Sequence, residues 1–224
     1  MRALADARGM PRGRIALVVA LAALLLPACG GGDAAEEPQK IGESGGLATY
    51  EVSGAGFSVA VPPDWQTVSV DDAFTEGQLE AMKEADPELA PYLDALEGSD
   101  SFVKLLALDP DIEQGFATNL NVIVEPVKID ITREQYFEAT MSQLRQLFGA
   151  DFEQDRVDLP AGEALHLTYE QFEDPSGGTV ATVQYILFED GNGYVLTYST
   201  LPDRVASSAA EFESSARSFR LLSR

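Results

Sequence analysis

Residues 185–200 have the sequence YILFEDGNGYVLTYST, in which two apolar runs flank the turn Asp190-Gly191-Asn192-Gly193. Asparagine and glycine accept positive φ angles, so this spacing is typical of a tight β-hairpin. The runs on either side predict strands at about 179–189 and 194–201. The sequence therefore places an antiparallel pair of strands near the end of the chain.

More strands are predicted on the N-terminal side of this hairpin, where β-branched and aromatic runs are bounded by turn residues. They lie at about 49–52, 56–61, 65–70, 102–108, 117–127, 152–159 and 162–172. In one of them, leucine and valine alternate with Asn119 and Asn121. This period of two is the pattern of a strand whose two faces meet different surroundings.

Helices are predicted between these strands. Thr132 followed by Gln135 forms a capping box, and Gly149 ends the amphipathic run behind it. The apolar stripe of this helix is Tyr136, Phe137, Met141, Leu144, Leu147 and Phe148. A closing helix from about Asp203 carries Val205, Ala209, Phe212, Ala216 and Phe219 at helical spacing, and two short helices are expected within 75–97. Antiparallel strands interrupted by helices predict an α+β fold, an antiparallel sheet with helices packed on it.

Four segments together resemble the PsbP-like family, which includes DcrB-type and LpqN-type bacterial lipoproteins. They are GFSVAVPPDW (56–65), the amphipathic helix after Thr132, YILFEDGNGYVLTYST and FESSARSFRL (212–221). The resemblance covers residues 47–222. It implies an α/β/α sandwich, in which helices flank the sheet, and a location in the cell envelope. It implies no catalytic residues, because no catalytic motif belongs to the family.

The first 28 residues have the features of an export signal. Four arginines (Arg2, Arg8, Arg12 and Arg14) precede an uncharged run from Ile15 to Leu26, which is shorter than the roughly 20 helical residues that cross a bilayer. Leu26-Pro27-Ala28-Cys29 resembles the lipobox of bacterial lipoproteins, where cleavage after Ala28 leaves a lipidated Cys29 as the new N-terminus. We therefore predict a signal peptide at 1–28 and a palmitate-bearing diacyl anchor on Cys29. The alternative is an ordinary secretory signal in which the cysteine falls there by chance.

The chain is strongly acidic, with a formal charge of −22. Removing residues 1–28, which contain four arginines and one aspartate, makes it −25. This charge excludes nucleic acid as the expected partner, since binding needs cations that neutralise phosphates. It also disfavours a basic membrane-binding surface, so we expect attachment through the lipid on Cys29. No other cysteine exists to form a disulfide or a cysteine-based zinc site.

The stretch that follows Cys29 is a predicted tether. Residues 30–46, GGGDAAEEPQKIGESGG, are polar and glycine-rich and lack apolar periodicity. We therefore assign residues 29–46 to a flexible linker and residues 47–224 to one domain, since about 175 residues can form a single core.

Two short features could suggest catalysis. His166 is the only histidine, and hence the only side chain whose ordinary pKa lies near neutrality. Its alternation with Leu165 and Leu167 predicts a polar position on a half-exposed strand rather than a base or a metal ligand. Gly42-Glu43-Ser44-Gly45-Gly46 matches the G-x-S-x-G elbow of α/β-hydrolases, but it lies in the tether and lacks the strand and helix that an elbow requires.

Other features could suggest a ligand or a metal. Residues 109–113 (DPDIE) begin like a calcium loop, yet Gln114 and Leu120 stand where the turn glycine and the closing glutamate are needed. The acidic residues between Glu76 and Glu97 are interpreted as a solvated helix face. Trp65 is interpreted as a core or edge anchor rather than a platform for sugars. No catalytic residue, metal or cofactor is predicted.

These observations predict a non-enzymatic lipoprotein, anchored to the cell membrane and facing away from the cytoplasm. Its domain would bind a protein, a lipid or a small molecule. One alternative is a secreted hydrolase that uses carboxylates or His166. Another is an assembly or stability factor for a membrane complex, which fold analogy with PsbP suggests. Apolar pockets would favour binding, and two converging carboxylates with raised pKa values would favour catalysis.

Overall fold

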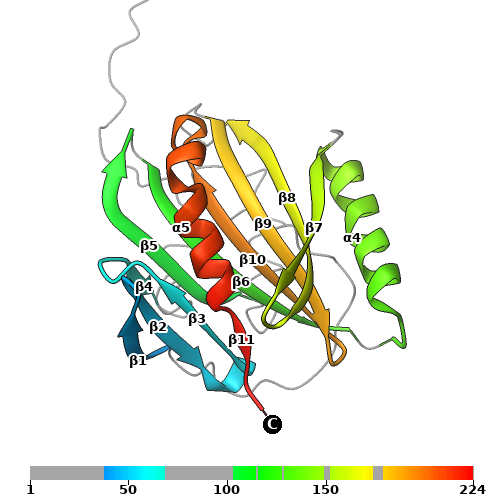
Figure 1. The fold of residues 1–224 in the computed structure, drawn as a ribbon. Helices are drawn as coiled ribbons and strands as arrows, with labels where there is room; N and C mark the ends of the chain where they lie inside the picture. The colour runs from blue at the N-terminus through cyan, green and yellow to red at the C-terminus, as the bar shows by residue number, and fades with distance from the viewer. Residues whose placement is uncertain are drawn as a thin grey trace, which may run out of the picture.

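The predicted hairpin lies at the centre of the larger of two antiparallel sheets (Figure 1). The computed structural model describes residues 38–68, 103–114, 116–127, 129–148, 152–173 and 179–223. Strands β9 (Thr179–Glu189) and β10 (Asn192–Thr200) pair over residues 181–189 and 192–200. Asp190 and Gly191 form the turn with φ angles of 51° and 73°, so the turn lies within the predicted segment, but an aspartate takes one of the positive φ angles and Asn192 belongs to β10.

The larger sheet has the strand order β4-β5-β6-β10-β9-β8-β7, and every neighbouring pair is antiparallel. Its remaining strands are β4 (Gln66–Val68), β5 (Val103–Glu113), β6 (Phe116–Pro126), β7 (Glu153–Leu159) and β8 (Gly162–Glu173). The central strands β6, β10 and β9 are therefore flanked on both sides, and both of their faces are buried.

The smaller sheet has the order β1-β2-β3-β11. Its strands are β1 (Gln39–Ser44), β2 (Leu47–Val52), β3 (Phe57–Val61) and β11 (Arg220–Leu221). β1 occupies residues that the sequence analysis assigned to the tether. It pairs with β2 through the backbone while all six of its side chains are exposed. Because nothing in β1 is buried, its sequence carries no apolar alternation that would have indicated a strand.

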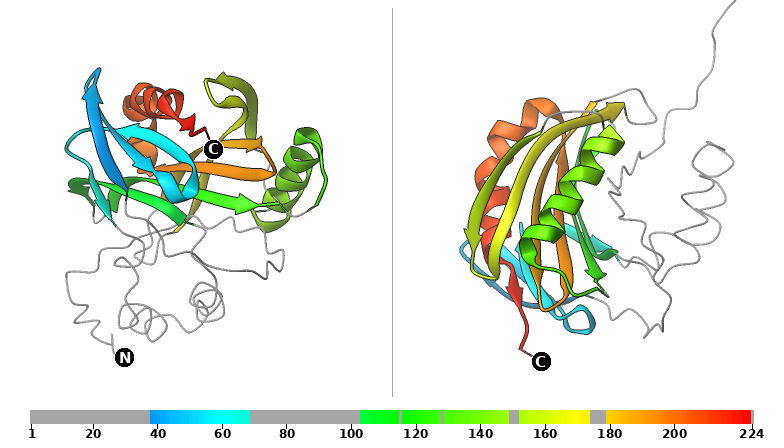
Figure 2. Two further views of the ribbon diagram at one scale, coloured as in Figure 1. Left: turned by 90° about the horizontal axis from the view of Figure 1, so that it is seen from below. Right: turned by 90° about the vertical axis from the view of Figure 1, so that its right-hand side faces the viewer.

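Helices α4 (Arg133–Phe148) and α5 (Val205–Ser218) lie on opposite faces of the larger sheet (Figure 2). The capping box of α4 is confirmed, because the Thr132 N–H donates to Gln135 Oε1 at 2.9 Å and the Gln135 N–H donates to Thr132 Oγ1 at 3.3 Å. We call the side of the larger sheet that carries α4 the α4 face. The core on this face includes Tyr136, Phe137, Met141, Leu144, Leu165, Leu167, Ile186 and Phe188.

The opposite face of the larger sheet is covered by α5 and by the smaller sheet together. Their shared core includes Tyr50, Phe57, Val59, Leu105, Leu120, Leu187, Leu196, Tyr198, Phe212 and Phe219. Phe219 follows α5 and stacks near Phe57 of β3, with 5.4 Å between ring centroids. The end of the chain therefore joins the two sheets.

This arrangement corrects the predicted fold class. We expected one antiparallel sheet flanked by helices, an α/β/α sandwich, and that expectation is wrong. Strands dominate the described residues, which contain two sheets and two α-helices. The reason is β2, whose alternating buried side chains give the chain a second sheet with an apolar face. That sheet, rather than helices alone, covers one side of the larger sheet.

Candidate functional site

Six polar side chains gather in the middle of the α4 face, and we call them the polar stripe. They are Asn119 and Asn121 of β6, Thr197 and Ser199 of β10, and Thr182 and Gln184 of β9. The strand register forms two rows, Asn121-Thr197-Gln184 and Asn119-Ser199-Thr182. At the usual spacings of strands and residues, the two rows cover about 7 by 10 Å. All six residues are at most 2% exposed.

Strand alternation places these side chains together. The residues between them, such as Leu120, Tyr198 and Val183, point into the core under the smaller sheet and α5. Successive side chains of a strand point to opposite faces, so the polar residues lie on the α4 face of the sheet. The polar residues of three neighbouring strands therefore lie side by side on one face of the sheet.

Five polar atoms of the polar stripe lack a hydrogen-bond partner among the described residues. Asn119 Nδ2, by contrast, donates to the Ala117 carbonyl at 3.0 Å. Gln184 Nε2 donates to Thr197 Oγ1 at 3.0 Å. Within the described part of the chain, no partner is found for Asn121 Nδ2 and Oδ1, Thr182 Oγ1, Gln184 Oε1 and Ser199 Oγ. A buried polar group without a partner costs about 1–3 kcal/mol. Native proteins leave few such groups, so this cluster is the part of the described chain where a further hydrogen-bonding partner is expected.

Helix α4 adds two more groups of this kind. Gln143 Oε1 and Tyr136 Oη are buried and make no hydrogen bond. All the unpartnered buried side-chain atoms found in the described residues therefore belong to the polar stripe or to α4. None of them lies in the core between the two sheets. Within the described residues, the α4 face thus differs from the opposite face in having buried polar atoms without hydrogen-bond partners.

The stripe carries no charge. Its members are amides and hydroxyls, which both donate and accept hydrogen bonds. The next row toward the β9–β10 turn is apolar and consists of Ile123, Val195 and Ile186. Such a surface suits a neutral hydrogen-bonding group and offers no countercharge for an ion.

A carboxyl lies further along the same face, beside the first turn of α4. Glu125 of β6 pairs with Gly193 of β10. A Cβ atom at Gly193 would lie 2.0 Å from the Tyr136 hydroxyl, so the glycine leaves the space that the phenol occupies. Tyr136 stacks on Phe188 with 4.8 Å between ring centroids. Because Gly193 has no side chain, Tyr136 of α4 can pack directly against the larger sheet.

Burial is the main cause of the pKa shifts of Glu125 and Tyr136. It raises the pKa of Glu125 to about 7, and the Tyr136 phenol opposes part of that shift. Burial first, and the charge of Glu125 second, raise the pKa of Tyr136, so the phenol stays protonated. The two groups are close enough to shift each other's pKa, although the hydroxyl does not meet hydrogen-bond geometry. Glu125 is thus a carboxyl that can change charge near neutral pH.

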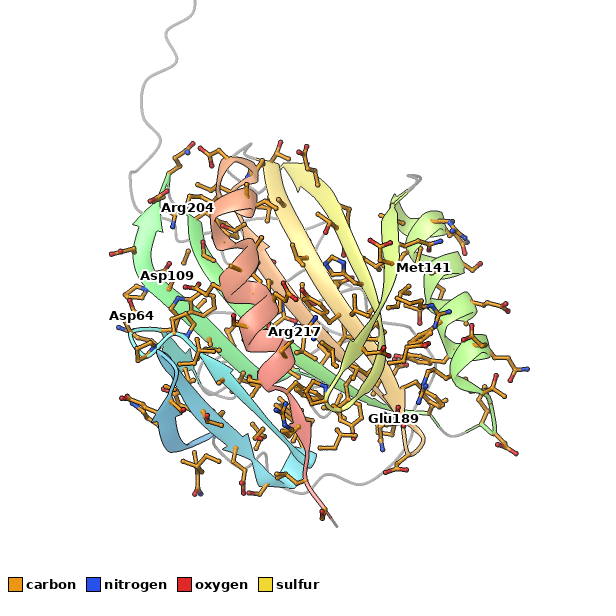
Figure 3. The ribbon with its side chains drawn as sticks, viewed as in Figure 1. Asp64, Asp109, Met141, Glu189, Arg204 and Arg217 are labelled. Carbon is orange, nitrogen blue, oxygen red and sulfur yellow. The ribbon has the colours of Figure 1, made fainter. Side chains whose placement is uncertain are left out.

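A cleft lies between α4 and β7. It has a volume of about 440 Å³ and is lined by Phe137, Glu138, Met141, Arg145, Gln154, Asp155, Arg156 and Leu165. The Arg156 guanidinium lies 4.4 Å from the centre of the Phe137 ring. It also forms ion pairs with Glu134 at 2.8 Å and Glu163 at 2.9 Å. Met141, in the wall of the cleft, is labelled in Figure 3.

His166 lies on β8, where the alternation placed it. It is half-buried, points away from the α4 face, and its ring centroid is 4.8 Å from that of Tyr185. Burial lowers the pKa of His166, while the charges of Asp155 and Glu213 act in the opposite direction. The histidine lies on the other side of the sheet from Glu125, so the structure does not bring these two groups into one site.

The G-x-S-x-G match belongs to a hairpin. Gly42 and Ser44 lie in exposed β1, and Gly45 and Gly46 turn into β2 with φ angles of 61° and 79°. The serine therefore lies on an exposed strand rather than on a strained turn between a buried strand and a helix.

Residues 109–113 extend β5 beyond a register shift. There the Asp111 N–H donates to Asp109 Oδ1 at 2.9 Å, and Glu113 pairs with Arg204. Figure 3 shows Asp109 and Arg204 far from Glu189 and Met141. No group of three metal-ligating side chains was found among the described residues.

Trp65 is 5% exposed and belongs to the core between the sheets, which confirms its interpretation as an anchor. Ala28, Cys29 and the acidic residues from Glu76 to Glu97 lie outside the described residues. No helix in the described part of the chain has the length and apolar character needed to cross a membrane.

The sequence analysis did not identify the polar stripe as a site. The available signal was the alternation of Asn119 and Asn121 with apolar residues, which equally fits a strand with one solvated face. Each of the strands β6, β10 and β9 contributes two polar residues, and only the register of the strands shows that these residues lie side by side. Only the packing shows that they are buried.

No family model matches the chain, and no curated protein matches it. Solved structures with a similar fold include cyanobacterial PsbP (CyanoP) from Synechocystis sp. PCC 6803, at 16% identity over 88% of this chain and 98% of that one, with a TM-score of 0.48. LpqN, involved in cell envelope biogenesis of Mycobacterium tuberculosis, is 12% identical over 83% of this chain and 90% of its own, with a TM-score of 0.46. PA94 of unknown function from Pseudomonas aeruginosa is 12% identical, covers 80% and 99% of the two chains, and has a TM-score of 0.44. These similarities are too distant to assign a function.

Proposed function

We propose that this chain is a non-enzymatic envelope lipoprotein, held at the membrane by a diacylated Cys29, whose domain binds a small uncharged ligand on the α4 face. The observation that carries the ligand proposal is the cluster of unpartnered buried atoms in the polar stripe. A neutral ligand with hydroxyl or amide groups would satisfy these atoms. Binding would remove an unfavourable term of about 1–3 kcal/mol for each group that gains a partner.

The distribution of carboxyl groups supports binding over hydrolysis. Among the described residues, Glu125 and Glu211 are the carboxyls with a raised pKa, and burial is the main cause for both. Glu125 lies on the α4 face, whereas Glu211 lies on α5 on the opposite side of the larger sheet. A hydrolase that relies on two carboxylates needs both of them at one bond. This pair does not meet that condition.

The ligand proposal is tested by thermal shift with a panel of uncharged polyols, monosaccharides and amides, and with charged counterparts of the same compounds. A ligand at 100 times its Kd stabilises the folded state by about 2.7 kcal/mol. For a domain of this size, that corresponds to a rise in Tm of roughly 5–10 °C. We expect such shifts only with uncharged compounds.

The chain offers a matched control on a single strand. Thr197→Val removes a hydroxyl from the polar stripe, and Thr200→Val removes a hydroxyl from the same strand on the opposite face, where it bonds Thr118 Oγ1 at 2.9 Å. We expect Thr197→Val to abolish the ligand-induced shift and Thr200→Val to preserve it. Equal effects of the two substitutions, or no shift with any uncharged compound, would contradict the ligand proposal.

The lipid anchor is tested separately. Cells that express the full chain should incorporate labelled palmitate into it, and the Cys29→Ser variant should not incorporate the label. The proposal rests on the basic head, the short apolar run and the lipobox-like Leu26-Pro27-Ala28-Cys29. Label that persists in Cys29→Ser would show that the anchor is elsewhere.

A further inference from the structure

Strand β7 is a terminal strand of the larger sheet as described, and it pairs there with β8 alone. The outer edge of a terminal strand presents backbone N–H and C=O groups that can pair with another chain. Extended peptides commonly bind in this way, as an added strand whose alternate side chains enter neighbouring pockets. The edge of β7 is therefore a place to look for a partner.

The cleft described above lies between this edge strand and α4. Phe137, Met141 and Leu165 give it apolar walls. From Phe137 to Arg145 the helix advances eight residues, which is about 12 Å along its axis. An extended peptide covers that distance with three to four residues. The cleft therefore matches a short strand in length and has an apolar middle.

Arginines lie toward both ends of the cleft. Arg156 lies over Phe137, and its two carboxylate partners are exposed, so those ion pairs contribute little and can be exchanged. Arg145, in the last turn of α4, is exposed and forms no ion pair within the described residues. Glu138 and Asp155 also line the cleft, so its charge is mixed and the arginines supply the two positive points.

We propose that this cleft binds an extended peptide segment of a partner protein, with an apolar residue flanked two places on either side by acidic residues. Residues i, i+2 and i+4 of a strand point to the same side. They span about 14 Å, comparable with the rise of about 12 Å along α4 from Phe137, over which Arg156 lies, to Arg145. The apolar residue contacts Phe137 and Met141 of α4, the acidic residues pair with Arg145 and Arg156, and the peptide backbone pairs with β7.

The test uses the full chain in detergent micelles and a fluorescein-labelled, end-blocked peptide, Gly-Thr-Asp-Thr-Leu-Thr-Glu-Thr-Gly. Binding is measured by fluorescence anisotropy. A second peptide carries lysine at both acidic positions. A third keeps every side chain but is N-methylated at alternate backbone nitrogens, which removes the donors that pair with a strand edge. We expect the first peptide to bind and the other two to bind at least tenfold more weakly.

Substitutions in the protein locate the site. Arg145→Glu should weaken binding of the first peptide at least tenfold, and Arg145→Gln should weaken it less. The control is Arg204→Glu, which reverses a charge that pairs with Glu113 and lies far from Met141 of the cleft (Figure 3). It should leave binding unchanged. Circular dichroism melts confirm that each variant is folded.

Four results would overturn the proposal. They are absence of binding by the first peptide, equal binding of the lysine or N-methylated peptide, insensitivity of binding to Arg145→Glu, and a doubled molar mass by light scattering that Arg145→Glu abolishes. The last result would mean that β7 pairs with a second copy of this chain. The proposal uses none of the residues of the polar stripe and stands or falls independently of the ligand proposed there.

Discussion

Replacing Glu125 with glutamine should stabilise the domain at pH 8 and leave its stability nearly unchanged at pH 4.5 and below. Burial raises the pKa of this carboxyl to about 7 in the folded state, against an ordinary value of 4.5. The folded protein therefore holds the proton more tightly than the unfolded chain does. This stabilisation is complete below pH 4.5 and is lost as the pH rises through 7. Glutamine has no charge to bury and keeps a similar shape.

The size of the effect follows from the shift. A difference from 4.5 to about 7 corresponds to at most about 3–4 kcal/mol, at 1.36 kcal/mol per pKa unit. Glu125 is half-buried, and solvent screening reduces the expected gain to about 1–2 kcal/mol. For a chain of this size, a gain of that order raises Tm by roughly 2–8 °C.

The assay is a series of thermal melts of the wild type and Glu125→Gln between pH 4 and pH 9. Other carboxyls titrate over the same range, so the informative quantity is the difference in Tm between the two proteins at each pH. Glu170→Gln removes a charge from an exposed position and serves as the control, with a difference near zero throughout. A Glu125→Gln difference that stays constant with pH, or a variant that is less stable at pH 8, would refute the reasoning.

Three further substitutions test the packing. Gly193→Ala places a Cβ 2.0 Å from the Tyr136 hydroxyl, so it should cost about 1–3 kcal/mol; in urea melts Tyr136→Phe should recover part of this loss, and a neutral Gly193→Ala would contradict the close contact. Ser215→Ala removes the hydroxyl that accepts from buried Tyr198 at 2.9 Å, and we expect a loss of about 1–3 kcal/mol in the same assay. Gln184→Leu removes an unpartnered buried amide oxygen, so the ligand-free domain should be as stable as the wild type or up to about 1 kcal/mol more stable. A large loss in Gln184→Leu would show that its bond to Thr197 dominates.

The sequence predicted those features that depend on interactions between residues close together in the chain. The turn at Asp190-Gly191 and the capping box at Thr132 depend on residues close together in the chain, and both are present as expected. β1 could not be predicted, because it is held by backbone pairing and buries no side chain. The second sheet was missed for a related reason. Alternation in β2 indicates that one face is buried, but it does not say what covers that face.

The candidate site could not be predicted for a similar reason, because it depends on residues that are far apart in the sequence. The alternation of Asn119 and Asn121 with leucine and valine correctly indicated two different strand faces. A sequence pattern does not distinguish a polar face in water from a polar face beneath other parts of the protein. That distinction required the register across β6, β10 and β9 and the exposures of their side chains.

The strand β11 ties the last part of the chain to one of the first. Arg220 pairs with Ser58, the Leu222 N–H donates to the Gly56 carbonyl at 2.9 Å, and the Ala60 N–H donates to Ser218 Oγ at 2.7 Å. A chain that is synthesised from its N-terminus cannot form these contacts until nearly all of it has been made. Until then β3 would have an unpaired edge and would be open to chaperones or proteases. A product that stops short of Phe219 would lack both this strand and a core aromatic residue, so incomplete molecules should be recognised and degraded while full-length ones close.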